Sequence, residues 1–296
     1  MRSPRQIHDS RCGFAFALLM AMFASGCSTS QIVVRGAMPL MDGGFTAMNR
    51  ETDLELARQA IPATLKMLEG MCLEDPRNTQ LRLYLAQGFY GYSYGFVEPD
   101  DTERAVALYT RCVQHAGAAL ESLGFTADPK SAPLQELDHA LAKASARQVP
   151  ALFWTASCLA KRTDVQRTDP RSIAELARAA RLMERVLALD ENYYFGGPHL
   201  FFGVYYGGRS PMFGGDFARS GQHFAKARAA TQGKLLLADL LYAEFLARQQ
   251  LDRDAFRERL DAVVAAPKDL FPDMAFVNQI AKQRARLLLL KESEWF

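Results

Sequence analysis

The chain has 296 residues, of which 49% are hydrophobic, so it has enough apolar surface for a large core in one domain or an elongated array. Its formal net charge is only +2, and the charges are interspersed along the sequence. No basic run with interleaved aromatic residues is present, which argues against a nucleic-acid partner.

Residues 1–26 have the pattern of a lipoprotein signal peptide. Three arginines precede a short apolar run at 14–23, which is too short to cross the roughly 30 Å of bilayer hydrocarbon as a helix. Small residues then lead directly to a cysteine (ASGC), as in a bacterial lipobox, so Cys27 is predicted to be the lipidated first residue of the mature protein. An ordinary cleaved signal, with the cysteine incidental, is the alternative. Ser28 stands where aspartate signals inner-membrane retention, which favours the periplasmic face of an outer membrane.

Downstream of residue 50 the pattern predicts a succession of helices and no convincing strand. Thr52 and Glu55 have the spacing of a capping box before the first helix, in which Pro62 is expected to cause a kink or a break. Asp169 and Pro170 have the pattern of an N-cap followed by an N1 proline. The predicted helices are Leu54–Glu69, Leu81–Tyr94, Thr102–Ser122, Leu134–Arg147, Pro150–Lys161, Ser172–Leu189, Pro198–Gly207, Phe217–Ala230, Lys234–Gln249, Arg253–Val264 and Pro272–Leu290.

These helices form pairs whose sequences resemble one another. First helices mix large and small residues, as in LFFGVYYG at 200–207, and second helices follow them, as in FARSGQHFAKARAA at 217–230. Tetratricopeptide-type repeats have this pattern, because a small residue on one helix lets its partner approach and a ring fills the gap. The first helices recur at intervals longer than the 34 residues of regular repeats, so the repeats are degenerate, and the helix at 134–147 is interpreted as an insertion.

We therefore predict an all-α fold, a superhelical array of antiparallel helix pairs that forms a tetratricopeptide-like solenoid. The predicted organisation is a signal peptide at 1–26, a lipidated N-terminus and tether at 27–50, and a helical repeat domain at 51–296.

The segment 192–216, NYYFGGPHLFFGVYYGGRSPMFGGD, combines many aromatic residues with many glycines. It follows no predicted strand and lacks the phosphate-loop signature, so a phosphate loop is disfavoured. Part of it is predicted to pack a helix crossing at Gly203, and part to line the concave wall of the superhelix, because tyrosine combines an apolar face with a polar tip. The balance between lining and core packing is left open. The candidate ligand- or partner-binding residues are Tyr193, Tyr194, Phe195, His199, Phe202, Tyr205, Tyr206 and Arg209, with Trp154, Tyr90 and Tyr94 from earlier helices.

Other polar residues are expected to have structural roles. His199 and His223 lie far apart in the sequence, with no carboxylate at motif spacing, and His199, beside Pro198, is expected to be a hydrogen-bonded structural residue. His115 is predicted to lie on a solvated helix face. Arg181 and Arg185, with Arg178, follow helical spacing and are predicted to form a charged outer face.

The cysteines indicate neither a metal cluster nor a redox pair, because no C-x-x-C motif is present. Cys72, Cys112 and Cys158 have apolar neighbours and are expected to be small buried residues. One disulfide among them is an alternative, since the predicted compartment is oxidising. No catalytic, metal or cofactor site is predicted, because no G-x-S-x-G or H-E-x-x-H motif or carboxylate pair at useful spacing is found.

After the lipobox come RETDLELARQAIP at 50–62, LYLAQGFYGYSYGFVE at 83–98, ALFWTASCLA at 151–160, and the aromatic and glycine-rich segment with FARSGQHFAKA at 217–227. In their order and sequence, these segments resemble the TRAP transporter T-component (TatT) lipoprotein family over nearly all of the mature chain. The resemblance implies a superhelix of cryptic tetratricopeptide repeats that assembles as a trimer, with a pore or pocket through each protomer. It also implies a periplasmic TRAP-type substrate-binding protein as partner and a small ligand, hydrophobic or a carboxylate. No catalytic residues come with the family.

The leading functional hypothesis is a lipid-anchored periplasmic accessory component of a TRAP-type transporter. Such a protein scaffolds a substrate-binding protein, holds or passes a small, partly apolar ligand, forms a homotrimer and meets the membrane through its lipid anchor only. The alternative is a general repeat adaptor for cell-envelope protein assembly, which predicts peptide binding in an open groove and no enclosed pocket. An enzyme is not predicted.

Overall fold

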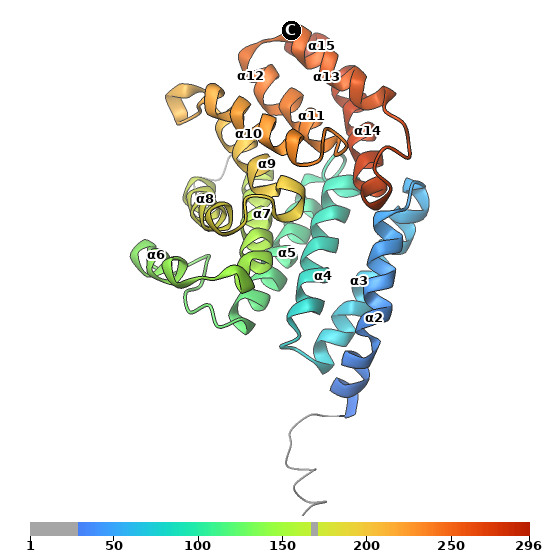
Figure 1. The fold of residues 1–296 in the computed structure, drawn as a ribbon, viewed down its shortest axis with the longest axis vertical. Coiled ribbons are helices and arrows are strands. Elements are labelled where there is room, and N and C mark those ends of the chain that lie inside the picture. The colour runs from blue at the N-terminus through green and yellow to red at the C-terminus, as the bar shows by residue number, and fades with distance from the viewer. Residues whose placement is uncertain (1–28, 167–170) are drawn as a thin grey trace, which may run out of the picture.

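The computed structural model describes residues 29–166 and 171–296, so the predicted signal peptide, Cys27 and the predicted cap at Asp169 and Pro170 lie outside the described residues. Every regular element in the described ranges is a helix, which confirms the all-α prediction (Figure 1). The elements are α2 (Thr29–Asn49), α3 (Leu54–Glu74), α4 (Thr79–Tyr92), η1 (Ser93–Val97), α5 (Thr102–Ser122), α6 (Leu134–Lys143), η2 (Ala146–Gln148), α7 (Val149–Val165), α8 (Arg171–Leu189), α9 (Tyr193–Gly207), η3 (Pro211–Phe213), α10 (Phe217–Ala230), α11 (Leu237–Leu241), η4 (Tyr242–Ala247), α12 (Arg248–Gln250), α13 (Arg253–Ala265), η5 (Pro272–Met274), α14 (Ala275–Leu290) and α15 (Glu292–Trp295).

Consecutive helices pack in pairs, as the sequence predicts. The pairs α4 with α5, α7 with α8, and α9 with α10 follow one another through the fold, and α11 to α15 cover one end of it (Figure 1). The main core runs through α2 to α9 and also receives Phe276 and Ile280 of α14. Phe256 and Leu260 of α13 belong to a second core in the C-terminal helices. The late helix α14 therefore packs against early parts of the chain as well as its own neighbours.

Helix α3 differs in detail from the prediction. Its N-cap is Asp53, whose Oδ1 accepts the amides of Glu55 and Leu56 at 2.9 and 3.1 Å, so the predicted capping box at Thr52 is wrong. Aspartate one position later provides a carboxylate oxygen, a strong N-cap acceptor, in place of the threonine hydroxyl. The helix also continues through Pro62 to Glu74 without a break, so a split at this proline is wrong too.

Helix α2 occupies the region expected only as a tether, and the sequence did not predict it as a helix. It contains Pro39 and three glycines, all poor helix formers, and only Val34 is buried. Its stability therefore comes from tertiary contacts: Arg35 Nε lies 2.9 Å from Asp75 Oδ2, and Phe45 stacks on Tyr84 with ring centroids 3.9 Å apart.

Helix α6 departs from the pairing and packs against α8, as expected of an insertion (Figure 1). The arginines of α8 hold it in place: Arg178 donates to Ala132 O at 2.7 Å, Arg181 donates to Asp138 Oδ1 at 2.6 Å, and Arg185 donates to Ala144 O. The charged face predicted for these arginines is therefore not an outer face, because the inserted helix lies over it.

The crossing of α9 and α10 explains Gly203. A Cβ atom at this position would lie 2.7 Å from Cε1 of Phe224, whose ring is buried. At Gly207 a Cβ atom would lie 2.5 Å from Ser220 Oγ, which donates to Gly203 O at 2.7 Å. The predicted small residue opposite a ring is confirmed here.

The cysteines are divided between a disulfide and a free thiol. Cys112 of α5 and Cys158 of α7 form a disulfide, with Cα atoms 5.7 Å apart, a usual separation for such a bond. They are therefore not simply small buried residues. Cys72 is free and buried, as predicted. The disulfide joins the second helix of one pair to the first helix of the next.

Replacing Gly203 by alanine should lower the free energy of unfolding by about 1–3 kcal/mol, because the added methyl group must displace the buried Phe224 ring. Gly117→Ala is the matched control. Gly117 lies in α5, where a Cβ would have no neighbouring atom within 4 Å, so the helix should gain roughly 0.5–1 kcal/mol. Urea titrations of both variants measure the effect, and equal effects of both would contradict the close approach at Gly203.

Reduction of the disulfide should lower the free energy of unfolding by about 2–4 kcal/mol, because the bond restricts the unfolded chain across a sequence separation of 46 residues. Urea unfolding with and without dithiothreitol measures this loss. The double variant Cys112→Ala/Cys158→Ala should be insensitive to dithiothreitol. An unchanged wild-type midpoint under reducing conditions would show that the bond is absent or without effect.

Candidate functional site

A cavity of about 600 Å³ lies between the helices, within the size range of small-molecule sites. Its walls come from α2, α3, α4, α7, α9, α11, η4 and α14, so segments from both ends of the chain enclose it. Most lining residues are apolar or aromatic. They include Met41, Phe45, Met48, Leu65, Leu68, Tyr90, Tyr94, Phe153, Trp154, Tyr194, Phe201, Tyr205, Leu241, Phe245 and Phe276.

The predicted candidate residues divide into two groups. Tyr90, Tyr94, Trp154, Tyr194, Tyr205 and Arg209 line the cavity. Tyr193, Phe195, His199, Phe202 and Tyr206 do not. In the second group, His199 and Phe202 are buried in the packing of α9, whereas Phe195 is 37% exposed.

An aromatic cluster at the start of α9 forms one wall of the cavity. The Tyr194 ring centroid lies 5.0 Å from that of Trp154 and 5.6 Å from that of Phe153. Gln87 of α4 donates to the Tyr194 hydroxyl at 3.0 Å. Burial raises the pKa of Tyr194 well above its ordinary value, so the hydroxyl stays protonated at neutral pH.

The backbone at this wall is strained, which explains the mixture of rings and glycines. Tyr194 and Phe195 have φ values of 47° and 61°, and Gly196 follows at 78°. Left-handed backbone at two aromatic residues is costly and persists only where the surroundings impose it. At Gly197, a Cβ atom would lie 2.6 Å from the Phe153 ring. The glycines therefore let the backbone turn and approach the rings that line the cavity.

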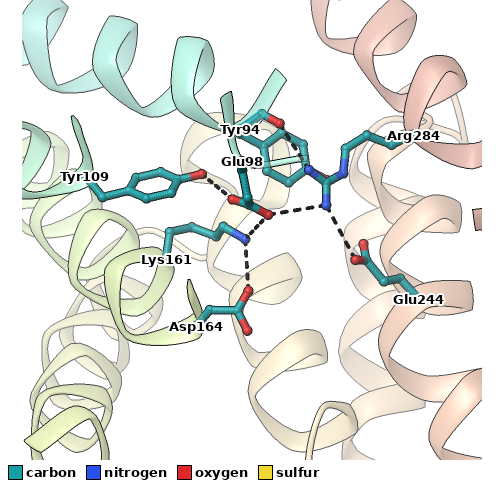
Figure 2. Close-up of polar contacts among 7 residues, drawn as sticks. All are labelled: Tyr94, Glu98, Tyr109, Lys161, Asp164, Glu244 and Arg284. Atoms are coloured by element: carbon teal, nitrogen blue, oxygen red, sulfur yellow. Dashed lines mark hydrogen bonds and ion pairs between the residues drawn. The ribbon is translucent and has the colours of Figure 1, made fainter. Parts of the chain in front are cut away.

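A buried network of charges lies beside the cavity, centred on Glu98 (Figure 2). Lys161 Nζ lies 3.0 Å from Glu98 Oε1 and 2.9 Å from Asp164 Oδ2, and the Tyr109 hydroxyl donates to Glu98 Oε2 at 2.6 Å. Arg284 Nη2 lies 3.3 Å from Glu98 Oε1. Glu98 thus joins α5, α7 and α14, and Lys161 and Asp164 also line the cavity.

Arg284 is the contribution of the C-terminal helices to this network. Its Nη1 donates to Tyr94 O at 3.1 Å, its Nη2 lies 3.5 Å from Glu244 Oε1, and its guanidinium carbon lies 4.1 Å from the Tyr94 ring centroid (Figure 2). Tyr94 and Glu244 lie in η1 and η4, which are π-helical segments. Such segments are rare and often occur at functional sites, because they redirect side chains within a helix.

Opposite charges set the ionisation of the network. Burial alone raises the pKa of Glu98, but Lys161 and Arg284 outweigh burial and hold this pKa below the ordinary 4.5. Burial likewise disfavours the charged form of Lys161, but the negative charges of Glu98 and Asp164 outweigh the effect of burial and raise the pKa of the amine. Glu98 and Lys161 are therefore both charged at neutral pH, and their mutual attraction offsets the cost of burying them.

Arg209 directly follows the C-cap of α9, Gly208, and lies in the glycine-rich loop. Its Nε donates to Tyr205 O at 3.1 Å, and its guanidinium carbon lies 3.9 Å from the Tyr205 ring centroid. Its Nη2 is buried and has no hydrogen-bond partner within residues 29–166 and 171–296. Arg209 thus brings an unsatisfied charged donor to the cavity wall.

The histidines are placed differently from the predictions. His199 and His223 lie together, with Nδ1 atoms 2.9 Å apart, and His199 Nε2 lies 3.2 Å from Glu191 Oε2. Packing of α9 on α10 brings together two histidines that are distant in sequence, and Glu191 provides His199 with a carboxylate partner that no motif spacing indicated. The hydrogen-bonded role predicted for His199 is confirmed. Burial, and then repulsion from His199, lower the pKa of His223 to about 4. His115 is buried between Arg82 and Glu69, so its predicted solvated position is also wrong.

Sequence reasoning missed Gln87, Phe153, Glu98, Lys161 and Arg284. Only Lys161 and Asp164 carry a local signal, since their i,i+3 spacing places opposite charges on one helix face. The pairing of Glu98 with Arg284 spans 186 residues and has no sequence signature.

Two kinds of feature are absent from the described part of the chain. Within it, no three His, Cys, Asp or Glu side chains are grouped so that they could hold a metal ion. None of the helices there combines the length and the apolar character needed to span a bilayer.

Replacing Lys161 by methionine should lower the free energy of unfolding by about 3–5 kcal/mol, because the buried Glu98 and Asp164 lose a shared cation. The loss should be largest at neutral pH. It should shrink as the pH falls below about 4.5, where protonation of Glu98 removes a buried negative charge that Lys161 balances in the wild type. Urea titrations across this pH range measure it. Lys66→Met removes an exposed lysine whose partner Glu69 keeps its pairing with Arg111, so it should cost under about 1 kcal/mol. Equal losses in both variants would contradict the role of the network.

Comparison with known proteins identifies a family. The model of the TRAP transporter T-component family matches residues 50–296. A protein of Treponema pallidum (strain Nichols), described as an uncharacterized protein, is 24% identical over 315 aligned positions, which cover 96% of this chain and 97% of that protein. Because the family model matches most of the chain, the protein belongs to the TRAP transporter T-component family.

Proposed function

We propose that this protein is a lipid-anchored periplasmic accessory component of a TRAP-type transporter. It holds a small, partly apolar ligand in the cavity and scaffolds a periplasmic substrate-binding protein. The ligand passes between the two proteins. The observation that carries the proposal is the 600 Å³ apolar cavity within a chain of the TRAP transporter T-component family. An adaptor for extended peptides requires an open groove instead.

The cavity has the features of a binding site for a small molecule. Its walls are aromatic and aliphatic, with polar groups at a few positions, a combination that buries a ligand and fixes its orientation. The strained backbone at Tyr194 and Phe195 supports a role beyond packing, because such strain is typical of ligand sites.

Attachment and assembly complete the proposal. The lipobox places a lipid on Cys27, two residues before α2 begins, so the helical domain stays close to the membrane, with the outer membrane favoured. The protein assembles as a homotrimer. The loop that carries Arg209 also exposes Met212 and Phe213, which are 87% and 74% accessible and are available to a protein partner.

Native mass spectrometry of the chain from Ser28 onward tests the proposal, because this segment contains the whole described fold. We expect three copies of the chain that retain a small molecule and capture a TRAP-type substrate-binding protein from the same genome. Gly91→Leu should abolish retention of the small molecule. Gly91 lines the cavity and a Cβ there has no neighbouring atom within 4 Å, so the leucine side chain can start into the cavity and occupy its space.

Gly117→Leu is the matched control. Gly117 also lies within a helix with no atom within 4 Å of a Cβ, but it does not line the cavity, so retention should be unchanged. Loss of the small molecule in both variants would place the ligand elsewhere. A bare monomer that ignores the substrate-binding protein would favour the envelope adaptor instead.

A further inference from the structure

Helix α2 exposes a face without charges. From Thr29 to Met41 the sequence TSQIVVRGAMPLM contains Arg35 as its single charged residue. With 3.6 residues per turn, one exposed arc of about 120° excludes Arg35 and collects six residues. They are Thr29, Ile32, Val33, Gly36, Pro39 and Leu40. Within this arc, Ile32, Val33 and Leu40 are 61%, 70% and 73% exposed.

The opposite face of α2 is apolar as well. It buries Val34 and contributes Met41 and Phe45 to the cavity wall. A helix that is apolar all round is normally covered all round, and an exposed apolar patch marks a surface that binds a protein or a membrane. The exposed arc of α2 is therefore expected to have a partner outside this chain.

The position of the predicted lipid indicates which partner this is. Cys27 lies two residues before Thr29, the first residue of α2. Two residues span at most about 7 Å, so a lipid on Cys27 holds the start of α2 at the bilayer surface. Leu40 lies about 16 Å further along the helix, at 1.5 Å per residue. A helix that begins this close to lipid, with an uncharged arc, fits a lipid surface.

The end of α3 adds to the apolar surface beside the start of α2. Arg35 Nε lies 2.9 Å from Asp75 Oδ2, which holds the two helix ends together (Figure 1). Leu73, two residues before Asp75, is 82% exposed. The C-terminal helices α13 and α15 lie at the opposite end of the molecule (Figure 1).

We propose that the exposed arc of α2 lies on the bilayer, with Ile32, Val33 and Leu40 between the head groups and the acyl chains. The proposal rests on the lipid of the proposed function and goes beyond it, because it adds a protein surface to the membrane contact. Aliphatic side chains gain free energy on leaving water, and this arc has no charged group to desolvate.

Fluorescence quenching tests the proposal on the chain from Cys27 onward, joined through the Cys27 thiol to a maleimide lipid in vesicles of phosphatidylethanolamine and phosphatidylglycerol. Cys72 is buried and Cys112 is joined to Cys158, so these cysteines do not compete for the coupling. The variant Leu40→Trp places a reporter on the arc. Acyl chains brominated near the head groups should lower its emission roughly twofold, after subtraction of the wild-type signal, as expected for an interfacial side chain.

Leu290→Trp is the matched control. Leu290 is 78% exposed and ends α14, next to α15 at the opposite end of the molecule (Figure 1), so its emission should be unchanged by the bromine. Adding Ile32→Ser and Val33→Ser to Leu40→Trp should remove the quenching while the attachment remains. Both residues are exposed, so the fold should be retained.

Equal quenching of the two tryptophan variants, or none in either, overturns the proposal. A blue shift of the Leu40→Trp emission that grows with protein density, without quenching, also overturns it, because a second copy of the chain then covers the arc. The chemical attachment makes this result independent of lipidation in the cell. Mass spectrometry of the protein isolated from its own membrane tests that step separately, and a missing lipid on Cys27 contradicts the anchor of the proposed function.

Discussion

The buried carboxylate of Glu98 is the constraint on which the enclosure of the cavity depends. It needs cations, and it finds them on two helices from different halves of the chain, Lys161 of α7 and Arg284 of α14 (Figure 2). Because one buried charge cannot remain unpaired, these helices must lie where they do. An array of helix pairs presents a concave surface, and the return of α14 to the early helices adds a further wall to it. The long-range pairing thus joins helices that line the cavity.

Close helix contacts shape the opposite wall. Gly203 and Gly207 bring α9 onto α10, and Gly197 brings the start of α9 onto Phe153. The large rings beside these glycines occupy two environments. The rings that face the helix crossing pack in the core, and the rings on the other face line the cavity. Helix α2 adds Met41, Phe45 and Met48 to the wall, although it lies outside the match to the family model. Methionine adapts readily to ligands of different shape.

The cavity therefore has two chemically different ends and an apolar wall between them. At one end, Lys161 is already neutralised by its neighbours, and this end contributes polarity without a free cation. At the other, Arg209 contributes an unmatched guanidinium held against Tyr205. A ligand that enters such a site is oriented by charge and retained by burial of its apolar surface. This combination supports the proposed role in holding a small ligand.

The sequence by itself determined the all-α class, the succession of paired helices, the small residue opposite a ring at Gly203, and the family. These features depend on local spacing, capping and periodicity, which are set by residues close together in the sequence. Only the tertiary structure decided that Tyr194 and Tyr205 face a cavity while Phe202 is core, that His199 meets His223, and that Glu98 pairs with Arg284. Helix α2 could also be identified only from the tertiary structure, because its weak helix formers are stabilised by contacts with other elements. Such facts depend on the path of the chain through space, because residues far apart in sequence satisfy one another's charge and volume.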